Sequence, residues 1–331
     1  MKKLLVKLFL FMAPIFLLSY FFDVWISKNL KNSNRSAEKE YTTWNAIYEG
    51  KVNSDLLIFG SSRAWIHIDP TMFSDSLGIS SYNLGIDGHN FWLQNLRYRE
   101  LLKNNKRPKF IICSLDYYTL KKNIDLYNSE QFLPYMLWNQ GVKEATISYN
   151  GFSSLDYEIP LIRYYGNYDA LETAIRFSTG HLSNPITRLK GYQGREEKWN
   201  SDFDDAKASM KRLEVKLDKP TIVLFENFLK ECKFNNIKLI FVYTPEYIEG
   251  QKFVSNRSQI MELYKKYSKQ YQIPFYDFSN DSISYEKKYF YNASHMNKVG
   301  SQLFTKKLID TLSSSDVLSK NQINENQNSS F

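Results

Sequence analysis

The chain has 331 residues, of which 43% are hydrophobic and 16% aromatic, and this excludes a disordered chain, a disulfide miniprotein and a repeat array. A formal net charge of +8 would suit nucleic acid if the basic residues were clustered, but they are scattered and no nucleic-acid-binding motif accompanies them. We therefore expect a large globular domain without a nucleic-acid partner. Its two cysteines, Cys113 and Cys232, lie in apolar segments and are expected to be inert core thiols.

The first 27 residues predict a membrane anchor. Two lysines open a run from Leu4 to Ile26 that is long enough to cross a bilayer, and its aromatic end suits the boundary between lipid and water. No clear cleavage site follows, so we favour an uncleaved single-pass anchor that places the domain outside the cytoplasm, in the cell envelope. A cleaved signal peptide remains the alternative.

The remainder divides by composition. Residues 28–50 are polar and predict a stalk, residues 51–313 predict the folded domain, and the Ser/Asn/Gln-rich residues 314–331 predict a disordered tail. Short apolar runs predict parallel strands at 55–60, 81–85, 109–116, 237–243 and 274–277. Helical patterns alternate with them at 91–102, 221–234, 256–270 and 298–312. This order predicts a three-layer α/β/α sandwich around a mostly parallel five-stranded sheet, with its site at the carboxyl ends of the strands.

About 100 residues interrupt this alternation, and we predict an aromatic-rich insertion over about 117–215. Tyrosines beside glycines, such as Tyr192 in the loop 190–194, can stack on sugar rings. A helical cap that buries the same rings is the alternative.

Two polar segments are candidates for chemistry. The first is Gly60-Ser61-Ser62, where the first strand should turn into a helix, so that a serine is exposed and helix N–H groups can stabilise an oxyanion. The second is the segment 291–300 before the last helix, where His295 can act as a general base and Asn292, three residues earlier, can hold its other ring nitrogen.

In this order, Gly-Ser-Ser, the later Asn-Leu-Gly85 and the terminal x-x-His resemble the SGNH/GDSL hydrolase family over residues 55–312. The resemblance implies that Ser62 is the nucleophile, that Gly85 donates its N–H to the oxyanion, and that Asn292 and His295 occupy the places of the family's terminal Asp-x-x-His pair. Together with the anchor, Gly-Ser-Ser looks most like the envelope branch, which includes the D-alanyl transfer protein of teichoic acid synthesis and the alginate O-acetylation proteins.

The sequence departs from that family at two places. The oxyanion asparagine of its third block is missing near Asp116, and Asn292 replaces the usual aspartate, for which Asp277 or Asp281 is a possible substitute. We expect Asn90 or Asp116 to compensate as an oxyanion donor or substrate ligand, and Arg63 to bind an anionic acceptor unless it forms a surface ion pair.

The leading hypothesis is therefore a membrane-anchored serine esterase or O-acyltransferase that acts on acyl groups, expected to be O-acetyl, of an envelope glycan. We expect no cofactor and no metal, and an integral membrane acyltransferase is a possible partner. Substrate ligands are expected at Arg63, Asp116 and Tyr192, and oxyanion donors at Ser62, Gly85 and Asn90. The alternative is a non-catalytic glycan-binding or assembly protein on a degenerate fold of this type.

Overall fold

The computed structural model describes residues 2–33, 39–88, 90–182, 188–315 and 317–318. The chain forms two compact units, each described here by itself. Unit 1 comprises residues 1–45 and 123–187, and unit 2 comprises residues 46–122 and 188–331.

Unit 2 holds a five-stranded, entirely parallel sheet in the order β2-β1-β3-β4-β5. Its strands are β1 (Leu56–Gly60), β2 (Ser81–Asn83), β3 (Phe110–Leu115), β4 (Lys238–Tyr243) and β5 (Phe275–Asp277). β1 and β3 are buried on both faces, which explains why they read as unbroken apolar runs. The predicted five-stranded α/β fold is confirmed.

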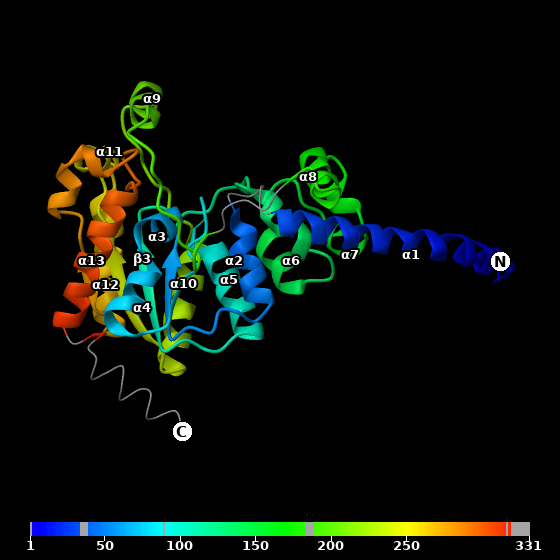
Figure 1. Ribbon diagram of the computed structural model, residues 1–331, viewed down its shortest axis with the longest axis horizontal. Helices are drawn as coiled ribbons and strands as arrows, with labels where there is room; N and C mark the ends of the chain where they lie inside the picture. Colours follow the sequence, from blue (N-terminus) through cyan, green and yellow to red (C-terminus); the bar gives the residue numbers. More distant parts are fainter. Residues whose placement is uncertain (1, 34–38, 89, 183–187, 316, 319–331) are drawn as a thin grey trace. The chain divides into compact units, whose positions relative to one another are not determined.

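Helices cover both faces of this sheet (Figure 1). One face packs α3 (Ser62–His67), α4 (Pro70–Leu77) and α13 (Lys298–Ser314) onto side chains such as Ile58, Ile112 and Val242. The other face packs α5 (Phe91–Asn104) and α10 (Lys219–Phe234) through aromatic contacts such as Phe59 with Tyr98, and α12 (Arg257–Tyr271) lies beside α10. The shorter helices of this unit are α9 (Asp202–Ser209), α11 (Ile248–Phe253), η4 (Ser282–Tyr285) and η5 (Lys287–Tyr289).

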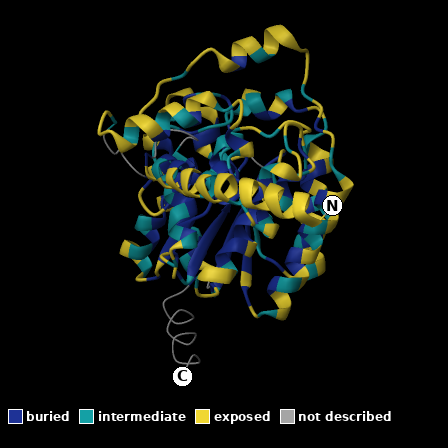
Figure 2. Ribbon diagram, turned by 90° about the vertical axis from the view of Figure 1, so that its right-hand side faces the viewer, coloured by how far each residue is buried: buried dark blue, intermediate teal, exposed yellow. Residues whose placement is uncertain are grey.

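Unit 1 is helical. It contains α1 (Lys2–Ser33), most of α2 (Glu40–Tyr48), η2 (Ser129–Tyr135), α6 (Gln140–Thr146), α7 (Leu155–Glu158), η3 (Ile162–Tyr164) and α8 (Tyr168–Ser178). Much of α1 is exposed (Figure 2), and by length and composition it is able to cross a membrane. Its last third presents one buried stripe, spaced as a helix requires, at Asp23, Ile26, Ser27, Leu30 and Ser33.

The structure differs from the expected stalk over 28–50. α1 continues to Ser33, and α2 buries Tyr41 and Trp44, whose indole nitrogen donates to Gln131 at 3.0 Å. The polar composition of residues 28–50 gave no indication of this packing, because their apolar residues are few and lie on one face of each helix. The expected insertion is also divided, since residues 123–187 join unit 1 while 188–215 belong to unit 2. Most of the expected disordered tail, residue 316 and residues 319–331, lies outside the described residues.

Candidate active site

Ser62 lies at the carboxyl edge of the sheet, where β1 turns into α3. Gly60 adopts a φ of +155°, and a Cβ there would lie 2.7 Å from the carbonyl oxygen of Ser114, so this turn requires glycine. Ser61 is the N-cap of α3, and its hydroxyl accepts the N–H of Arg63 at 3.3 Å. Ser62 is therefore the first helical residue, and its own N–H has no partner within the helix.

Ser62 and His295 are in direct contact although 233 positions separate them. The distance from Ser62 Oγ to His295 Nε2 is 2.7 Å, and His295 Nδ1 lies 3.0 Å from Asn292 Oδ1. An amide oxygen only accepts, so Nδ1 carries the ring proton, and Nε2 is free to accept the serine proton. This is the tautomer that a general base for Ser62 needs.

The chain of hydrogen bonds continues to a carboxylate. Asn292 Nδ2 donates to Asp202 Oδ2 at 3.0 Å, and Asn200 donates to the same oxygen at 2.9 Å. Asp202 is the first residue of α9, in the part of the expected insertion that belongs to unit 2. A catalytic triad usually has an aspartate in direct contact with the imidazole. Here Asn292 lies between Asp202 and His295, and the chain of hydrogen bonds from His295 through Asn292 to Asp202 is called the relay.

The loop that carries His295 is held on three sides. Asn292 Oδ1 also accepts the N–H groups of Ser294 and His295, which closes a tight turn. The ring of Tyr291 stacks on His295 with centroids 5.4 Å apart. The N–H of Met296 donates to Nε2 of buried His67 at 3.0 Å. These contacts fix the imidazole before any substrate arrives.

The imidazole of His295 is held neutral. Burial lowers the pKa of His295 to about 3, and the positive charges of Arg63 and Arg195 act in the same direction, while Asp202 opposes them. The ring is therefore neutral near neutral pH, and the neutral ring is the form that accepts a proton from Ser62.

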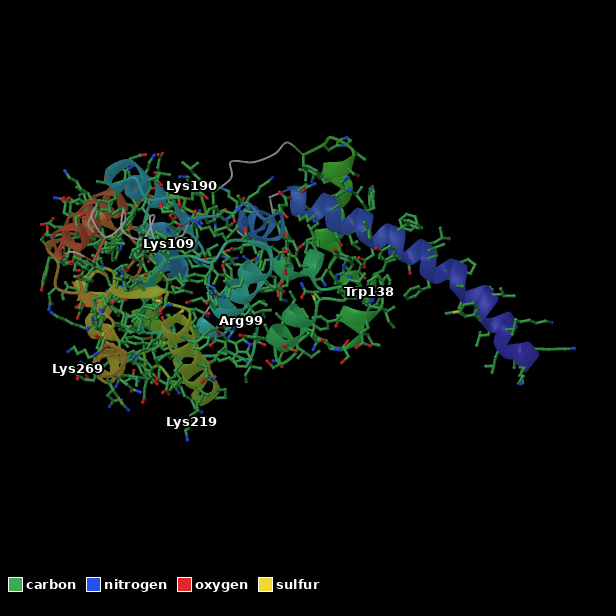
Figure 3. The ribbon with its side chains drawn as sticks, turned by 90° about the horizontal axis from the view of Figure 1, so that it is seen from below. Arg99, Lys109, Trp138, Lys190, Lys219 and Lys269 are labelled. Carbon is green, nitrogen blue, oxygen red and sulfur yellow. The ribbon has the colours of Figure 1, made fainter. Side chains whose placement is uncertain are left out.

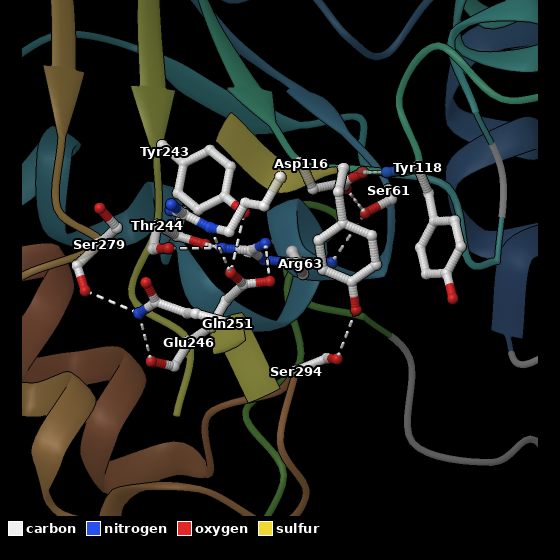
Figure 4. A network of polar contacts seen from close by, with 12 residues as sticks. Ser61, Arg63, Asp116, Tyr118, Tyr243, Thr244, Glu246, Gln251, Ser279 and Ser294 are labelled. Carbon is white, nitrogen blue, oxygen red and sulfur yellow. Dashed lines mark hydrogen bonds and ion pairs between the residues drawn. The ribbon is translucent and has the colours of Figure 1, made fainter. Parts of the chain in front are cut away.

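Arg63 does not take the expected role of a ligand for an anionic acceptor. It is buried and donates to Thr244 and, at 2.6 Å, to Glu246, and its guanidinium lies over the ring of Tyr243 (Figure 4). Because the guanidinium is turned into this network, it is not a surface ion pair either. The network fastens the first helix turn after Ser62 to the end of β4.

Asp116 is likewise structural rather than a substrate ligand. It is buried, it accepts the hydroxyl of Ser61 at 2.5 Å, and it accepts the N–H of Tyr118 at 2.7 Å (Figure 4). The carboxylate therefore ties the end of β3 to the N-cap of α3. It stabilises the turn that presents Ser62.

The two oxyanion donors expected beside Ser62 are engaged elsewhere. The N–H of Gly85 donates to Asn83 Oδ1 at 2.9 Å, and a Cβ on Gly85 would lie 2.6 Å from the backbone nitrogen of Trp65, so this glycine serves close packing. Asn90 is the N-cap of α5, where its oxygen accepts the N–H of Trp92 and its amide nitrogen donates to the carbonyl of Lys121. Of the expected donors, the N–H of Ser62 is the one that the geometry leaves for an oxyanion.

Three further candidates lie in other contacts. Tyr192 is buried, and its hydroxyl pairs with Ser301 on α13 at 2.8 Å, so it is not an exposed stacking platform for sugars. Asp281 caps η4 and Asp277 accepts the N–H of Ser279, so neither holds the imidazole. Asn292 occupies that position instead.

A cavity of about 170 Å³ adjoins the dyad on the side of the imidazole. Its walls combine polar residues of the relay with apolar side chains of α9 and α11, and include Tyr117, Tyr118, Asp202, Phe203, Ala206, Leu213, Phe253, Val254, Asn292 and His295. Its size is close to that of an engineered cavity of about 150 Å³ that binds benzene. The cavity thus offers an acyl or alcohol group a site beside the base.

Sequence reasoning missed Asp202 and Phe203. The segment Ser201–Asp205 holds three acidic residues at the start of a short helix, a pattern that also fits ordinary stabilisation of a helix N-terminus. Nothing in the local sequence distinguishes the carboxylate that meets Asn292, which lies 90 positions away.

No family model matches the sequence, and no curated protein matches it. Among solved structures, the chain is similar to a candidate acylhydrolase from Bacteroides fragilis, with 15% identity and a TM-score of 0.36 over 82% of this chain and 95% of that one.

Proposed function

We propose that this protein is a serine acyl hydrolase or acyltransferase anchored in a membrane. The observation that carries the proposal is the hydrogen-bonded chain from Ser62 through His295 and Asn292 to Asp202. A serine paired with an imidazole that is itself oriented by a third polar group is the constellation used for nucleophilic attack on acyl groups, and here the third group is an amide backed by a carboxylate.

The first half-reaction transfers the acyl group to the enzyme. Ser62 Oγ attacks the carbonyl carbon of an ester while its proton moves to His295 Nε2, and the N–H of Ser62 donates to the oxyanion. The intermediate then collapses, the bond to the alcohol breaks, and the alcohol leaves with the proton from His295. The products are acyl-Ser62, a free alcohol and a neutral imidazole.

The second half-reaction reverses these roles. Water or an acceptor hydroxyl gives its proton to His295 and attacks the acyl carbon. The bond between that carbon and Ser62 Oγ then breaks, and the proton returns from His295 to Ser62 Oγ, which leaves the free acid or the new ester. Hydrolysis and transfer differ only in which hydroxyl reaches the acyl carbon. The relay from Asn292 to Asp202 stabilises the imidazolium that exists between the two proton transfers.

The cavity beside His295 supports the substrate class that we propose. Its volume of about 170 Å³ suits a small acyl group rather than a long chain, and the ring of Tyr118, which is 39% exposed, suits the apolar face of a sugar. We propose O-acyl groups, in the first place O-acetyl, on an envelope glycan as the substrate, and the envelope side of the membrane as the location. An integral membrane acyltransferase is then the donor partner if the reaction is transfer.

Membrane anchoring is supported by the fold of unit 1. Asp23 on α1 forms a buried, two-pronged ion pair with Arg163, with both distances 2.7 Å, and accepts the N–H of Leu161 at 2.7 Å. Cleavage beyond Asp23 would remove the carboxylate that pairs with Arg163, so this buried ion pair favours retention of α1 at least from Asp23 onward. We propose that the exposed apolar part of α1 is retained with it as the anchor.

The test is covalent labelling of the full chain in detergent with a serine-directed fluorophosphonate, read by intact mass. We expect one adduct on the unaltered protein and none on Ser62→Ala or His295→Ala. Ser74→Ala, which alters another half-buried serine on a helix, and His181→Ala, which alters an exposed histidine, are the matched controls and should label fully.

The engaged N–H of Gly85 and side chain of Asn90 favour one alternative, a glycan-binding protein without turnover. It predicts no adduct on the folded, unaltered protein and glycan binding that survives Ser62→Ala. An adduct that persists in Ser62→Ala would assign the nucleophile to another residue.

A further inference from the structure

The change from exposed to buried residues along α1 indicates where the membrane surface would lie on unit 1. From Lys2 to Phe22, α1 is exposed along almost its whole length, and at 1.5 Å per residue this segment spans about 31 Å, close to the hydrocarbon thickness of a bilayer. Burial begins at Asp23, where α1 enters the packing of the unit. The boundary between lipid and water therefore falls near Tyr20 to Asp23 if α1 crosses the bilayer.

Other parts of unit 1 are fixed to α1 at this level. The ring of Trp138 stacks on Tyr20 with centroids 5.3 Å apart and an interplanar angle of 18°. The N–H of Leu161 and the guanidinium of Arg163 bind the carboxylate of Asp23. α8 packs along α1 (Figure 1). Leu161 and Arg163 cannot move away from α1 without breaking these polar contacts with Asp23.

The surface of unit 1 in this region exposes several large apolar side chains. Trp138 is 59% exposed, Ile162 is 39% exposed and Tyr165 is 87% exposed. The exposed apolar side chains that flank Trp138 and Leu161, here called the collar, are Trp138, Leu155, Ile159, Ile162, Tyr165 and Tyr168.

Hydrogen bonds place Trp138 beside the segment that carries the other members of the collar. The backbone N–H of Trp138 donates to the carbonyl of Tyr157, and its indole N–H donates to the carbonyl of Glu158 at 3.1 Å, which places it beside α7. Figure 3 shows Trp138 on the part of unit 1 next to α1. Ile159 and Ile162 flank Leu161, and Tyr165 follows η3 directly.

We infer that the collar is a membrane-seating surface that lies in the interfacial layer of the same bilayer that α1 crosses. Tryptophan and tyrosine concentrate at that depth because one end of each ring is apolar and the other forms hydrogen bonds. The neighbouring ion pair of Lys143 with Glu158, at 2.6 Å, suits the headgroup layer above it. Unit 1 is then held at the membrane by the collar as well as by the anchor.

This inference rests on the membrane-spanning part of the proposed function and on nothing about its chemistry. The experiment uses the full chain in vesicles of phosphatidylcholine and phosphatidylglycerol, with a spin label on single introduced cysteines, and compares collision with oxygen and with a water-soluble nickel chelate. Native Cys113 and Cys232 are buried, and the unaltered chain measures their background.

The test positions are Tyr165→Cys and Trp138→Cys. Phe234→Cys is the aqueous control, because Phe234 on unit 2 has the same exposed fraction, 87%, as Tyr165. Phe11→Cys on the exposed part of α1 is the hydrocarbon control. We expect the ratio of oxygen to nickel collisions at both test positions to exceed that at Phe234 several-fold and to stay below that at Phe11.

Three results would overturn the inference, and they are distinguishable. In the first, the two test labels are as accessible to nickel as the Phe234 label while the Phe11 label is in lipid. This result would contradict the membrane role of the collar and leave that of α1 intact. In the second, the Phe11 label is in water, which would contradict the membrane role of α1 as well as that of the collar. Labels at the collar that are shielded from both reagents in native membranes, yet exposed to nickel in vesicles, would assign the surface to a protein partner.

Discussion

Asp202 provides the most discriminating perturbation of the site. Two hydrogen bonds of 3.0 Å each, joined by one amide, put its carboxylate about 7 Å from the imidazole of His295. At this distance a unit charge stabilises the imidazolium by about 2 kcal/mol at an effective dielectric constant near 20, and by about 0.6 kcal/mol in water. Asp202 is exposed, so the result lies within this interval.

The expected result for Asp202→Asn is therefore a fall in kcat of about 3- to 30-fold, because the imidazolium forms only during the reaction. The pH profile gives a second reading. Asp202 raises the pKa of His295, so its removal moves the acid limb of kcat/KM to lower pH or leaves it outside the accessible range. General damage to the site would hydrate the ring and move that limb up, toward 6.5.

The assay is steady-state hydrolysis of p-nitrophenyl acetate by the full chain in detergent. Asp205→Asn is the matched control, because Asp205 lies on the same helix turn and accepts from Ser201 at 3.0 Å, without a contact to Asn292. Equal losses in the two variants, or no loss in Asp202→Asn, would refute the relay.

A charge exchange tests the same pair from the other side. Asn292→Asp alone puts two carboxylates in hydrogen-bond contact, and like charges this close oppose each other. The double variant, which adds Asp202→Asn, has one carboxylate at position 292 in contact with His295 and an amide at position 202 in contact with that carboxylate. We expect the double variant to exceed the Asn292→Asp single variant in kcat, and simple additivity of the two losses would contradict the coupling.

Three further perturbations probe the surroundings of Ser62. The pKa of His295 is lowered to about 3, so kcat/KM should hold its value as pH falls through 6.5 and decline only on approach to about 3; a decline centred near 6.5 would show a solvated base. Arg63→Met leaves the buried carboxylate of Glu246 with the Tyr243 hydroxyl at 2.8 Å and Arg257 at 3.9 Å as its remaining partners, which should cost up to about 3 to 5 kcal/mol of unfolding free energy in denaturant titrations. Arg99→Met at a more exposed ion pair is its control and should cost less than about 1 kcal/mol. Gly85→Ala should cost about 1 to 3 kcal/mol and lower the melting temperature, because its Cβ meets the backbone of α3; an unchanged melting temperature would mean that the close approach is absent.

Much of the fold was predictable because it depends on local pattern. A strand buried on both faces is mostly apolar, so β1, β3 and β4 stand out in the sequence, and the turn at Gly60 follows from its small residues. The predicted pairing of Ser62 with His295 depended on the order of motifs along a parallel sheet, and the structure places the two 2.7 Å apart.

The roles of the residues around the dyad were not predictable. Arg63, Asp116 and Asn90 each stand at the end of a strand or the start of a helix, which is where ligands and structural caps both occur. Their side chains are turned toward partners far along the chain, such as Glu246 for Arg63. Local sequence does not encode which of these partners the fold brings near.

The sequence by itself determined the parallel α/β fold, the apolar first helix and the two segments that carry Ser62 and His295, since each depends on the order of neighbouring residues. Tertiary structure alone decided that Asp202 stands behind Asn292, that Asp23 is buried against Arg163, and that Gly85 is packed rather than presented to a substrate. The physical reason is that a buried polar group is stable only with a partner, and the partner is chosen by how distant segments pack.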